Sequence, residues 1–197
     1  MRVLVACEYS GAVRDQFIRK GLKAVSCDIS PTESFGPHIR DDVRAVLNDG
    51  WDMMIAHPPC TYLANSANKH LYIEADREAK AQAAALFFRE LLNAPIPHIC
   101  IENPIMRHAV KRVGRKHDQL IQPYQFGHME SKATCLWLKG LAPLQPISDL
   151  KDVTFALPAS KRQRMFHMSP GKNRGKERSR TYHGIAWAMA EQWSNLA

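Results

Sequence analysis

The sequence lacks the features of a membrane-bound or secreted protein. None of its apolar runs approaches the roughly 20 residues that a membrane-spanning helix needs. Its first seven residues form an apolar run without the basic, apolar and cleavage regions of a signal peptide. We therefore expect a cytoplasmic protein that has no membrane partner.

Cysteine is scarce and widely scattered. The chain has five cysteines, and no two of them form a CxxC pair, which argues against both a disulfide framework and a zinc cluster. The histidines show no ligand spacing either, so we expect no metal. Cys7, Cys27, Cys100 and Cys135 lie in apolar segments typical of strands, where a free cysteine usually packs as a small core residue. Cys60 has different surroundings.

Acidic residues are almost missing from one stretch of the chain. Between positions 161 and 180, eight residues are basic and only Glu177 is acidic, in a chain whose formal net charge is +8. Such a block suits a polyanion, and it is equally typical of a solvated segment without a partner. The residues that we expect to bind nucleic acid are Lys161, Arg162, Arg164, Arg174 and Arg178.

Apolar runs typical of strands alternate with helical patterns along the chain. We expect strands at 2–7, 24–27, 53–56, 99–101 and 134–138, and helices at 12–20, 71–93 and 184–193. In the long middle helix, Leu86, Phe87 and Leu91 would face the core. The alternation predicts an α/β fold with a parallel sheet flanked by helices. After Gly140 the pattern has no clear period, which indicates a loop-rich basic insertion before the last helix.

Four polar residues lie at or just after the ends of expected strands. They are Glu8, Asp28, Cys60 and Glu102. In an open parallel sheet, the carboxyl ends of the strands form the edge at which ligands bind. We therefore expect these four side chains to converge on one crevice.

The turn that carries Cys60 is the sharpest signal. Pro58 and Pro59 follow a buried strand and impose a rigid, extended turn, which would fix the Cys60 thiol at the crevice. A lone free cysteine is also commonly buried and inert, and a lone Glu102 would suit a helix cap or a loop. At a neighbouring strand end, however, a Glu102 carboxyl could hydrogen-bond the Watson–Crick edge of an extruded cytosine.

Two motifs together resemble the DNA cytosine C5-methyltransferase family in their order and separation. Pro58-Pro59-Cys60 and Glu102-Asn103-Pro104 stand where that family has Pro-Cys-Gln and Glu-Asn-Val. The resemblance covers most of the chain. It implies a Rossmann-like class I S-adenosylmethionine-dependent methyltransferase fold with a mostly parallel sheet. It also implies a Cys60 nucleophile, Glu102 on the base, and Lys132 in place of the family's arginine near the base.

The family's cofactor site falls on recognisable segments. Residues 8–11 occupy the place of the glycine-rich loop, Asp28 matches the acid that binds the cofactor ribose, and Asp42-Val43 matches the pair beside the adenine. Residues 179–186 resemble a C-terminal motif that returns to the cofactor pocket. The implied S-adenosylmethionine contacts are Cys7, Glu8, Tyr9, Ser10, Gly11, Asp28, Ile29, Asp42, Val43 and Pro58.

The chain departs from the family's pattern at several positions. Leu4 and Ala6 replace an aspartate and a phenylalanine, and Gly11 is the only glycine kept in the glycine-rich loop. Thr61 stands where glutamine is usual and Pro104 where valine is usual, and the recognition region is very short. These departures bear on individual cofactor contacts more than on the reaction class. They are also compatible with a different one-carbon donor.

The resemblance implies an organisation and a set of partners. Residues 1–140 would form a cofactor-binding and catalytic domain, 141–180 a short basic segment similar to a target-recognition region, and 181–197 a helix that returns to the catalytic domain. The partner would be double-stranded DNA with a flipped cytosine, bound by a monomer in a bacterial or phage-infected cell. Three alternatives stay open: an amino-methyltransferase, an inactive nucleic-acid-binding module, and a C5-modifying enzyme that acts on RNA or a nucleotide.

Overall fold

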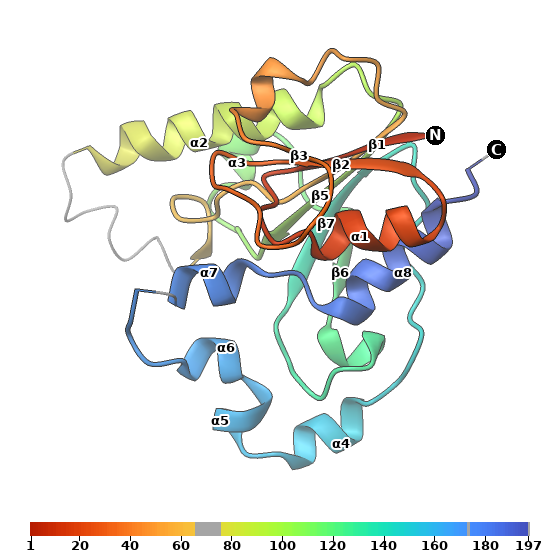
Figure 1. Ribbon diagram of the computed structural model, residues 1–197. Coiled ribbons are helices and arrows are strands. Elements are labelled where there is room, and N and C mark those ends of the chain that lie inside the picture. The colour runs from red at the N-terminus through yellow and green to blue at the C-terminus, as the bar shows by residue number, and fades with distance from the viewer. Residues whose placement is uncertain (66–75, 173, 197) are drawn as a thin grey trace.

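A computed structural model of the chain describes residues 1–65, 76–172 and 174–196. These residues form a seven-stranded sheet between two layers of helices (Figure 1), with strand order β3-β2-β1-β4-β5-β7-β6. The strands are β1 (Arg2–Ala6), β2 (Lys23–Cys27), β3 (His38–Ile39), β4 (Met53–Ala56), β5 (His98–Pro104), β6 (Gln119–Ile121) and β7 (Thr134–Lys139). In the described parts of the chain, no helix has the length and apolarity to span a membrane.

The helices vary widely in length. They are α1 (Ala12–Arg19), α2 (Arg77–Leu92), α3 (Val110–Val113), α4 (Lys151–Ala156), α5 (Ala159–Arg162), α6 (Arg164–His167), α7 (Arg174–Ser179) and α8 (His183–Trp193), with short 3-10 turns η1 (Val43–Ala45) and η3 (Pro123–Phe126). The long helix α2 covers one face of the sheet, and α1 together with α8 covers the other.

The central strands are apolar along their length because both of their faces are covered. In β4, Met54 packs in the cluster beneath α2, whereas Met53 and Ile55 pack in the cluster beneath α1 and α8. All three side chains are fully buried. Continuous burial of this kind is typical of parallel strands between helical layers. Met53 and Met54 are therefore core residues.

The helix predictions hold in most respects. Val13 and Phe17 of α1 are fully buried, as the spacing predicts, and the last helix docks on the core. In α2, Leu91 is buried but Leu86 is 50% exposed, so the prediction for Leu86 was wrong. Ala85 and Phe88 of this helix face the core instead. The first five residues of the expected long helix, 71–75, lie outside the described residues.

One end of the sheet is antiparallel. β7 runs antiparallel to β5, with Glu102 opposite Leu136, and β6 runs antiparallel to β7. The strand at β5 therefore continues through Glu102-Asn103-Pro104 rather than ending before it. Trp137 of β7 is fully buried and contacts Phe88 edge to face, with ring centroids 5.0 Å apart. The sheet is thus mostly parallel, with an antiparallel edge that the residue pattern did not reveal.

The basic segment after β7 contains short helices as well as the loops that the sequence indicated. Four short helices, α4 to α7, together bury only Thr154, and α4, α5 and α6 lie below the sheet in Figure 1. Helices of four to six residues are too short to display a 3.6-residue period, which explains why the sequence indicated loops.

A buried arginine shapes the loop that follows β2. Arg14 is fully buried in α1, and its guanidinium donates to the carbonyl oxygens of Ser34 at 3.2 Å and Pro37 at 3.4 Å. Gly11 has a φ of 74°, and a Cβ at this position would lie 2.5 Å from the Arg14 guanidinium. Gly11 therefore fits both the left-handed turn and the close approach of Arg14.

Candidate active site

The register of two neighbouring strands brings His57 beside Glu102. Ala56 of β4 pairs in parallel with Ile101 of β5, so the next residue of each strand lies at the same level of the sheet. His57 Nδ1 lies 3.0 Å from Glu102 Oε2, and the two side chains are only 8% and 14% exposed. The carboxyl edge of the sheet thus carries a buried histidine–carboxylate pair.

The turn that carries Cys60 is fixed from both sides. The His57 amide donates to the carbonyl oxygen of Ala6 at 2.9 Å, and Asn103 Nδ2 donates to the carbonyl oxygen of Pro58 at 2.8 Å. The Cys60 carbonyl accepts the amide of Ala64 at 2.9 Å, so the chain begins a helical turn directly after the thiol. These bonds hold the half-buried Cys60 at the sheet edge beside Glu102.

The surroundings of Cys60 act on its thiol in opposite directions. Burial raises the pKa of Cys60 above its ordinary value, and the charge of Glu102 adds to that rise. The charges of Lys132 and Arg178 oppose it. In the free protein the thiol form therefore prevails, and any further cation brought to this edge would favour the thiolate.

Burial and pairing compete at His57 and Glu102. Burial disfavours the charged form of His57, but the hydrogen bond and charge of Glu102, with a smaller contribution from Glu8, outweigh burial and raise its pKa. Burial likewise disfavours ionised Glu102, but the hydrogen bond and charge of His57 outweigh burial and lower its pKa. The pair is therefore stabilised as an imidazolium and a carboxylate.

Lys132 closes the site from the segment before β7. Its Nζ donates to the carbonyl oxygen of Arg178 at 3.0 Å and lies 5.6 Å from the centre of the Tyr182 ring. A recess of about 10 Å³ lies between these groups. It is lined by Glu102, Lys132, Thr134, Arg180, Thr181, Tyr182 and Ile185. This volume is close to that of one water-sized probe, so a base could enter only after side chains move.

The carboxyl end of β2 presents an acid and an apolar side chain together. Asp28 is half-buried, and its Oδ1 accepts the amide of Ser30 at 2.8 Å. Ile29 beside it is 75% exposed. A carboxylate can accept hydrogen bonds from ribose hydroxyls, and an exposed apolar side chain beside it can cover a purine ring, so these residues fit a nucleoside cofactor.

Other residues expected at the cofactor have structural partners. Glu8 is buried, and its carboxylate accepts the amides of Val13 at 2.7 Å and Arg14 at 3.2 Å, which caps α1. A cofactor contact from Glu8 would therefore come through its backbone. Asp42 accepts the amide of Arg44 at 2.9 Å and caps η1, while Val43 is buried in the core.

Cys7 differs from the expected strand cysteine. It follows β1 and is half-buried, with a left-handed φ of 57°. Burial, followed by the charge of Asp28, raises the pKa of Cys7 to about 12. The turn from β1 into the loop at 8–11 therefore passes through a conformation that is uncommon for a residue with a side chain.

Helix α7 lies against the loop at 8–11. The Tyr9 hydroxyl donates to the carbonyl oxygen of Lys176 at 2.7 Å and lies 3.1 Å from Ser179 Oγ. Lys176 and Arg180 both form ion pairs with Glu33, which belongs to the loop after β2. The basic segment is thus attached to the expected cofactor edge by tyrosine hydrogen bonds and by ion pairs.

The expected nucleic-acid contacts fall into two groups. Arg164 pairs with Glu130 at 3.0 Å, Arg162 donates to the carbonyl oxygen of Leu157, and Arg174 to that of Met168. Within the ranges that the structure describes, the side chains of Lys161 and Arg178 have no such partner. The cationic ends of these two residues are therefore the ones available to an external anion.

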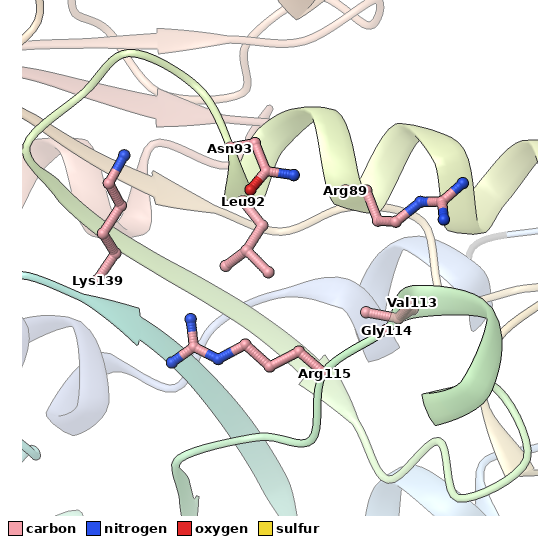
Figure 2. Close-up of a pocket in the computed structure, with 7 residues that line it drawn as sticks. All are labelled: Arg89, Leu92, Asn93, Val113, Gly114, Arg115 and Lys139. Atoms are coloured by element: carbon pink, nitrogen blue, oxygen red, sulfur yellow. The ribbon is translucent and has the colours of Figure 1, made fainter.

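A wider cavity lies at the opposite edge of the sheet and is separate from this site. Its volume is about 400 Å³, and the residues that line it include basic side chains from α2, the segment after α3, and β7 (Figure 2). Lys139 pairs with Ile99 at the start of β5, and its Nζ donates to the carbonyl oxygen of Ala94. Arg115 pairs with Asp118. These two cations are thus engaged within the protein.

The sequence predicted that Cys60, Glu102 and Lys132 lie near one another, but it did not predict the contact between His57 and Glu102. Cys60, Glu102 and Lys132 act on one another electrostatically, as a shared site requires. His57, which the residue pattern did not single out, is in direct contact with Glu102. The sequence carried no signal for this contact, because the contact depends on the register between β4 and β5.

Comparisons with known proteins show a likeness of fold. No protein-family model and no curated protein matches the sequence. Among solved structures, the Entamoeba histolytica methyltransferase EhMeth matches with a TM-score of 0.50 and 17% identity, over 76% of this chain and 57% of that chain. The S. pombe Dnmt2 methyltransferase matches at 0.47 and 12%, over 83% of this chain and 56% of that one.

A third match is a putative DNA modification methyltransferase encoded within an E. coli prophage, with a TM-score of 0.45 and 14% identity, over 80% of this chain and 55% of that one. The chain thus spans little more than half the length of the structures that it matches. With the sheet order described above, the match at 0.50 shows that the chain has the Rossmann-like class I methyltransferase fold, as its sequence predicts.

Proposed function

We propose that the protein is an S-adenosylmethionine-dependent DNA cytosine C5-methyltransferase with Cys60 as its nucleophile. The observation that carries this proposal is the register between β4 and β5, which sets the rigid Cys60 turn beside Glu102. Lys132 and Arg178 supply positive charge at the same place. The acid and apolar pair at the end of β2 would hold the cofactor along the same edge.

In this proposal Cys60 acts by covalent catalysis. Cytosine C5 is a poor nucleophile until the Cys60 sulfur bonds to C6 and the ring becomes an enamine. The cofactor supplies a methyl group on a sulfonium. Glu102 stabilises the ring as electron density moves toward N3, and Lys132 with Arg178 favours the thiolate. Loss of the C5 proton then breaks the bond between C6 and sulfur and frees Cys60.

The cofactor would lie on the edge formed by β1 and β2. Asp28 would accept hydrogen bonds from the ribose hydroxyls, and Ile29 would cover the purine ring. The loop at 8–11 would pass under the amino-acid part of the cofactor. Contacts from Cys7, Asp42, Val43 and Pro58 remain predictions of the family resemblance.

The DNA would contact the basic segment. In this proposal, residues 141–180 act as a short target-recognition segment of a monomer, and 1–140 with 181–197 form the catalytic body. Lys161 and Arg178 offer free charge to the phosphates. The target cytosine has to leave the duplex for C6 to reach the Cys60 sulfur, which would also require the recess beside Lys132 to open.

The decisive experiment is covalent trapping. DNA rich in 5-fluorocytosine, incubated with the protein and S-adenosylmethionine, should give an adduct that survives denaturation, because fluorine cannot leave C5 as a proton. Cys60→Ser should give none, since a hydroxyl is far less nucleophilic than a thiol near neutral pH. Cys135→Ala, which removes a buried thiol from β7, should still give the adduct.

Nucleoside analysis separates the proposal from its alternatives. Digested DNA from the reaction should contain 5-methylcytosine, whereas an amino-methyltransferase would produce a base methylated on its exocyclic nitrogen. Product in RNA or free nucleotide alone would contradict DNA as the substrate. Cofactor binding without any product would indicate an inactive binding module. A Cys60→Ser protein that methylates C5 at the wild-type rate would overturn the assignment of the nucleophile.

A further inference from the structure

We propose that His57 and Glu102 act as one unit that holds the proton destined for ring nitrogen N3 of the target cytosine. Glu102 would touch the base, and His57 would be the positioning residue that stores the proton behind it. This inference rests on the proposed C5-transfer function and adds a residue to its site. The carboxylate alone could accept a hydrogen bond from the cytosine amino group but has no proton to give to N3.

The geometry indicates that His57 and Glu102 are held in a fixed hydrogen-bonded pair. His57 Nδ1 and Glu102 Oε2 are 3.0 Å apart, and both side chains are almost fully buried. The backbone on each side is fixed, by the hydrogen bond from the His57 amide to Ala6 and by that from Asn103 to Pro58. His57 Nε2 is buried and has no hydrogen-bond partner among the described residues. The bond to Glu102 is therefore the polar contact that orients the ring.

The charges around the pair favour keeping one proton on it. Glu102 contacts His57 from β5, and Glu8 acts on His57 from the turn after β1. The positive charge of Lys132, from the segment before β7, lowers the pKa of both residues, so it opposes the charged form of His57 and favours ionised Glu102. The Cys60 thiol lies at the end of the same turn, and the charge of Glu102 acts on it. Two carboxylates against one ammonium group stabilise an imidazolium at His57.

The proton moves in step with the covalent bond. As the Cys60 sulfur bonds to C6, the electron pair of the C5–C6 double bond shifts toward C4 and the pair of the C4–N3 double bond moves onto N3. Glu102 accepts the proton of His57 Nδ1 and passes it to N3, which leaves a neutral imidazole and an ionised Glu102. After C5 has accepted its methyl group and given its proton to a water molecule, N3 returns its proton to the pair as the bond between C6 and sulfur breaks. The pair thus starts and ends with one proton.

The first test observes the proton directly and needs no activity. In ¹⁵N-labelled protein, NMR should show that His57 titrates above the ordinary histidine pKa of 6.5 and that its pKa falls in Glu102→Gln. The His57 signal is assigned by its loss in His57→Asn. Titration of His57 at or below 6.5, or no response to Glu102→Gln, would overturn the proposal.

The second test measures single-turnover trapping on 5-fluorocytosine DNA across pH. His57→Asn keeps an amide N–H near the position of Nδ1, but the amide cannot take up and release a proton near neutral pH. It should trap on the order of 100-fold more slowly, the usual loss when a general acid is removed. Its pH profile should lack the break that coincides with the His57 titration in wild type. Its affinity for S-adenosylmethionine should stay close to wild type.

The outcomes separate the two levels of the proposal. If wild-type protein forms neither adduct nor 5-methylcytosine, the proposed function fails, and the proton store falls with it. If wild type forms the adduct and His57→Asn matches its rate and pH profile, only the role of His57 fails. A slower His57→Asn protein whose pH profile keeps the wild-type break would mean that His57 positions Glu102 without supplying a proton, which also overturns the inference.

Discussion

Asn103 Nδ2 donates a hydrogen bond of 2.8 Å to the carbonyl oxygen of Pro58, which ties the strand beside Glu102 to the turn that carries Cys60. Asn103 is 1% exposed, so its removal would leave a buried carbonyl without a partner. Asn103→Ala should therefore lower the free energy of unfolding by about 1–3 kcal/mol. Urea unfolding measures this loss. Asn93→Ala, at the exposed end of α2, should change stability by less than about 0.5 kcal/mol.

Asp28 is the residue on which cofactor affinity should depend. Asp28→Ala removes a charged hydrogen-bond acceptor from the ribose and should weaken S-adenosylmethionine binding by about 1.5–3 kcal/mol. Calorimetry of the free protein with the cofactor measures this. Asp149→Ala, which alters a carboxylate at the start of α4, should leave the affinity unchanged. Equal affinities in the two variants would remove Asp28 from the site.

Tyr9 should hold α7 in place. Tyr9→Phe deletes the hydroxyl that bonds the Lys176 carbonyl and contacts Ser179, and it leaves the ring under the Lys176 ammonium group. Trypsin should then cleave after Lys176 or Arg178 several times faster, because local opening of an exposed helix costs little free energy. Tyr124→Phe is a suitable control, since the Tyr124 ring packs on Phe155. Identical cleavage rates would show that the hydroxyl does not anchor the helix.

The His57–Glu102 pair should give folding stability a pH window. The raised pKa of His57 contributes stability that is full below 6.5 and is lost as pH rises through that raised value. The lowered pKa of Glu102 contributes stability that is full above 4.5 and is lost as pH falls through that lowered value. Wild type should therefore exceed His57→Asn most between pH 4.5 and 6.5.

Urea unfolding of both proteins at about pH 5.5 and about pH 9 tests this sign. The stability difference should shrink at the higher pH, where His57 is neutral in both the folded and the unfolded chain. A difference that grows with pH would show that burial, rather than Glu102, controls the ionisation of His57.

The basic side chains of Lys161 and Arg178, which have no partner among the described residues, should determine how DNA binding depends on salt. Arg178→Ala and Lys161→Ala should each reduce the slope of log affinity against log salt by about 0.9, the value for one phosphate contact. Arg164→Ala should have a smaller effect, because Arg164 is paired with Glu130. Lys23→Ala, at the opposite edge of the sheet, serves as the control. Slopes unchanged by Arg178→Ala and Lys161→Ala would mean that the segment is only solvated.

The sequence predicted those parts of the fold whose residue pattern reflects burial on both faces. Met53–Ala56 and the last helix came out almost to the residue, because continuous apolar runs and helical spacing record their surroundings. The direction of β7 was not predictable in this way. The apolar pattern of a buried strand is the same whether the strand is parallel or antiparallel to its neighbour. Only the pairing with β5 shows that β7 is antiparallel.

The candidate site was predictable where chain topology alone determines it. Parallel strands end at one edge, so Cys60 and Glu102 had to approach one another. The contact between His57 and Glu102 required the register, which the sequence did not contain. The ion pairs of Glu33 with Lys176 and Arg180 join segments almost 150 residues apart, and no local pattern records such a contact.

Helix α7 touches both ends of the proposed site, since Tyr9 bonds the carbonyl of Lys176 and Lys132 bonds the carbonyl of Arg178. A ligand that moves the loop at 8–11 therefore changes the free energy of the contacts at Lys132, and a base that displaces Lys132 changes those at Tyr9. Thermodynamic reciprocity then requires each ligand to alter the affinity of the other by the same factor. Two binding events at separate strand ends would thus behave as a single coupled equilibrium, with these six helical residues as the coupling element.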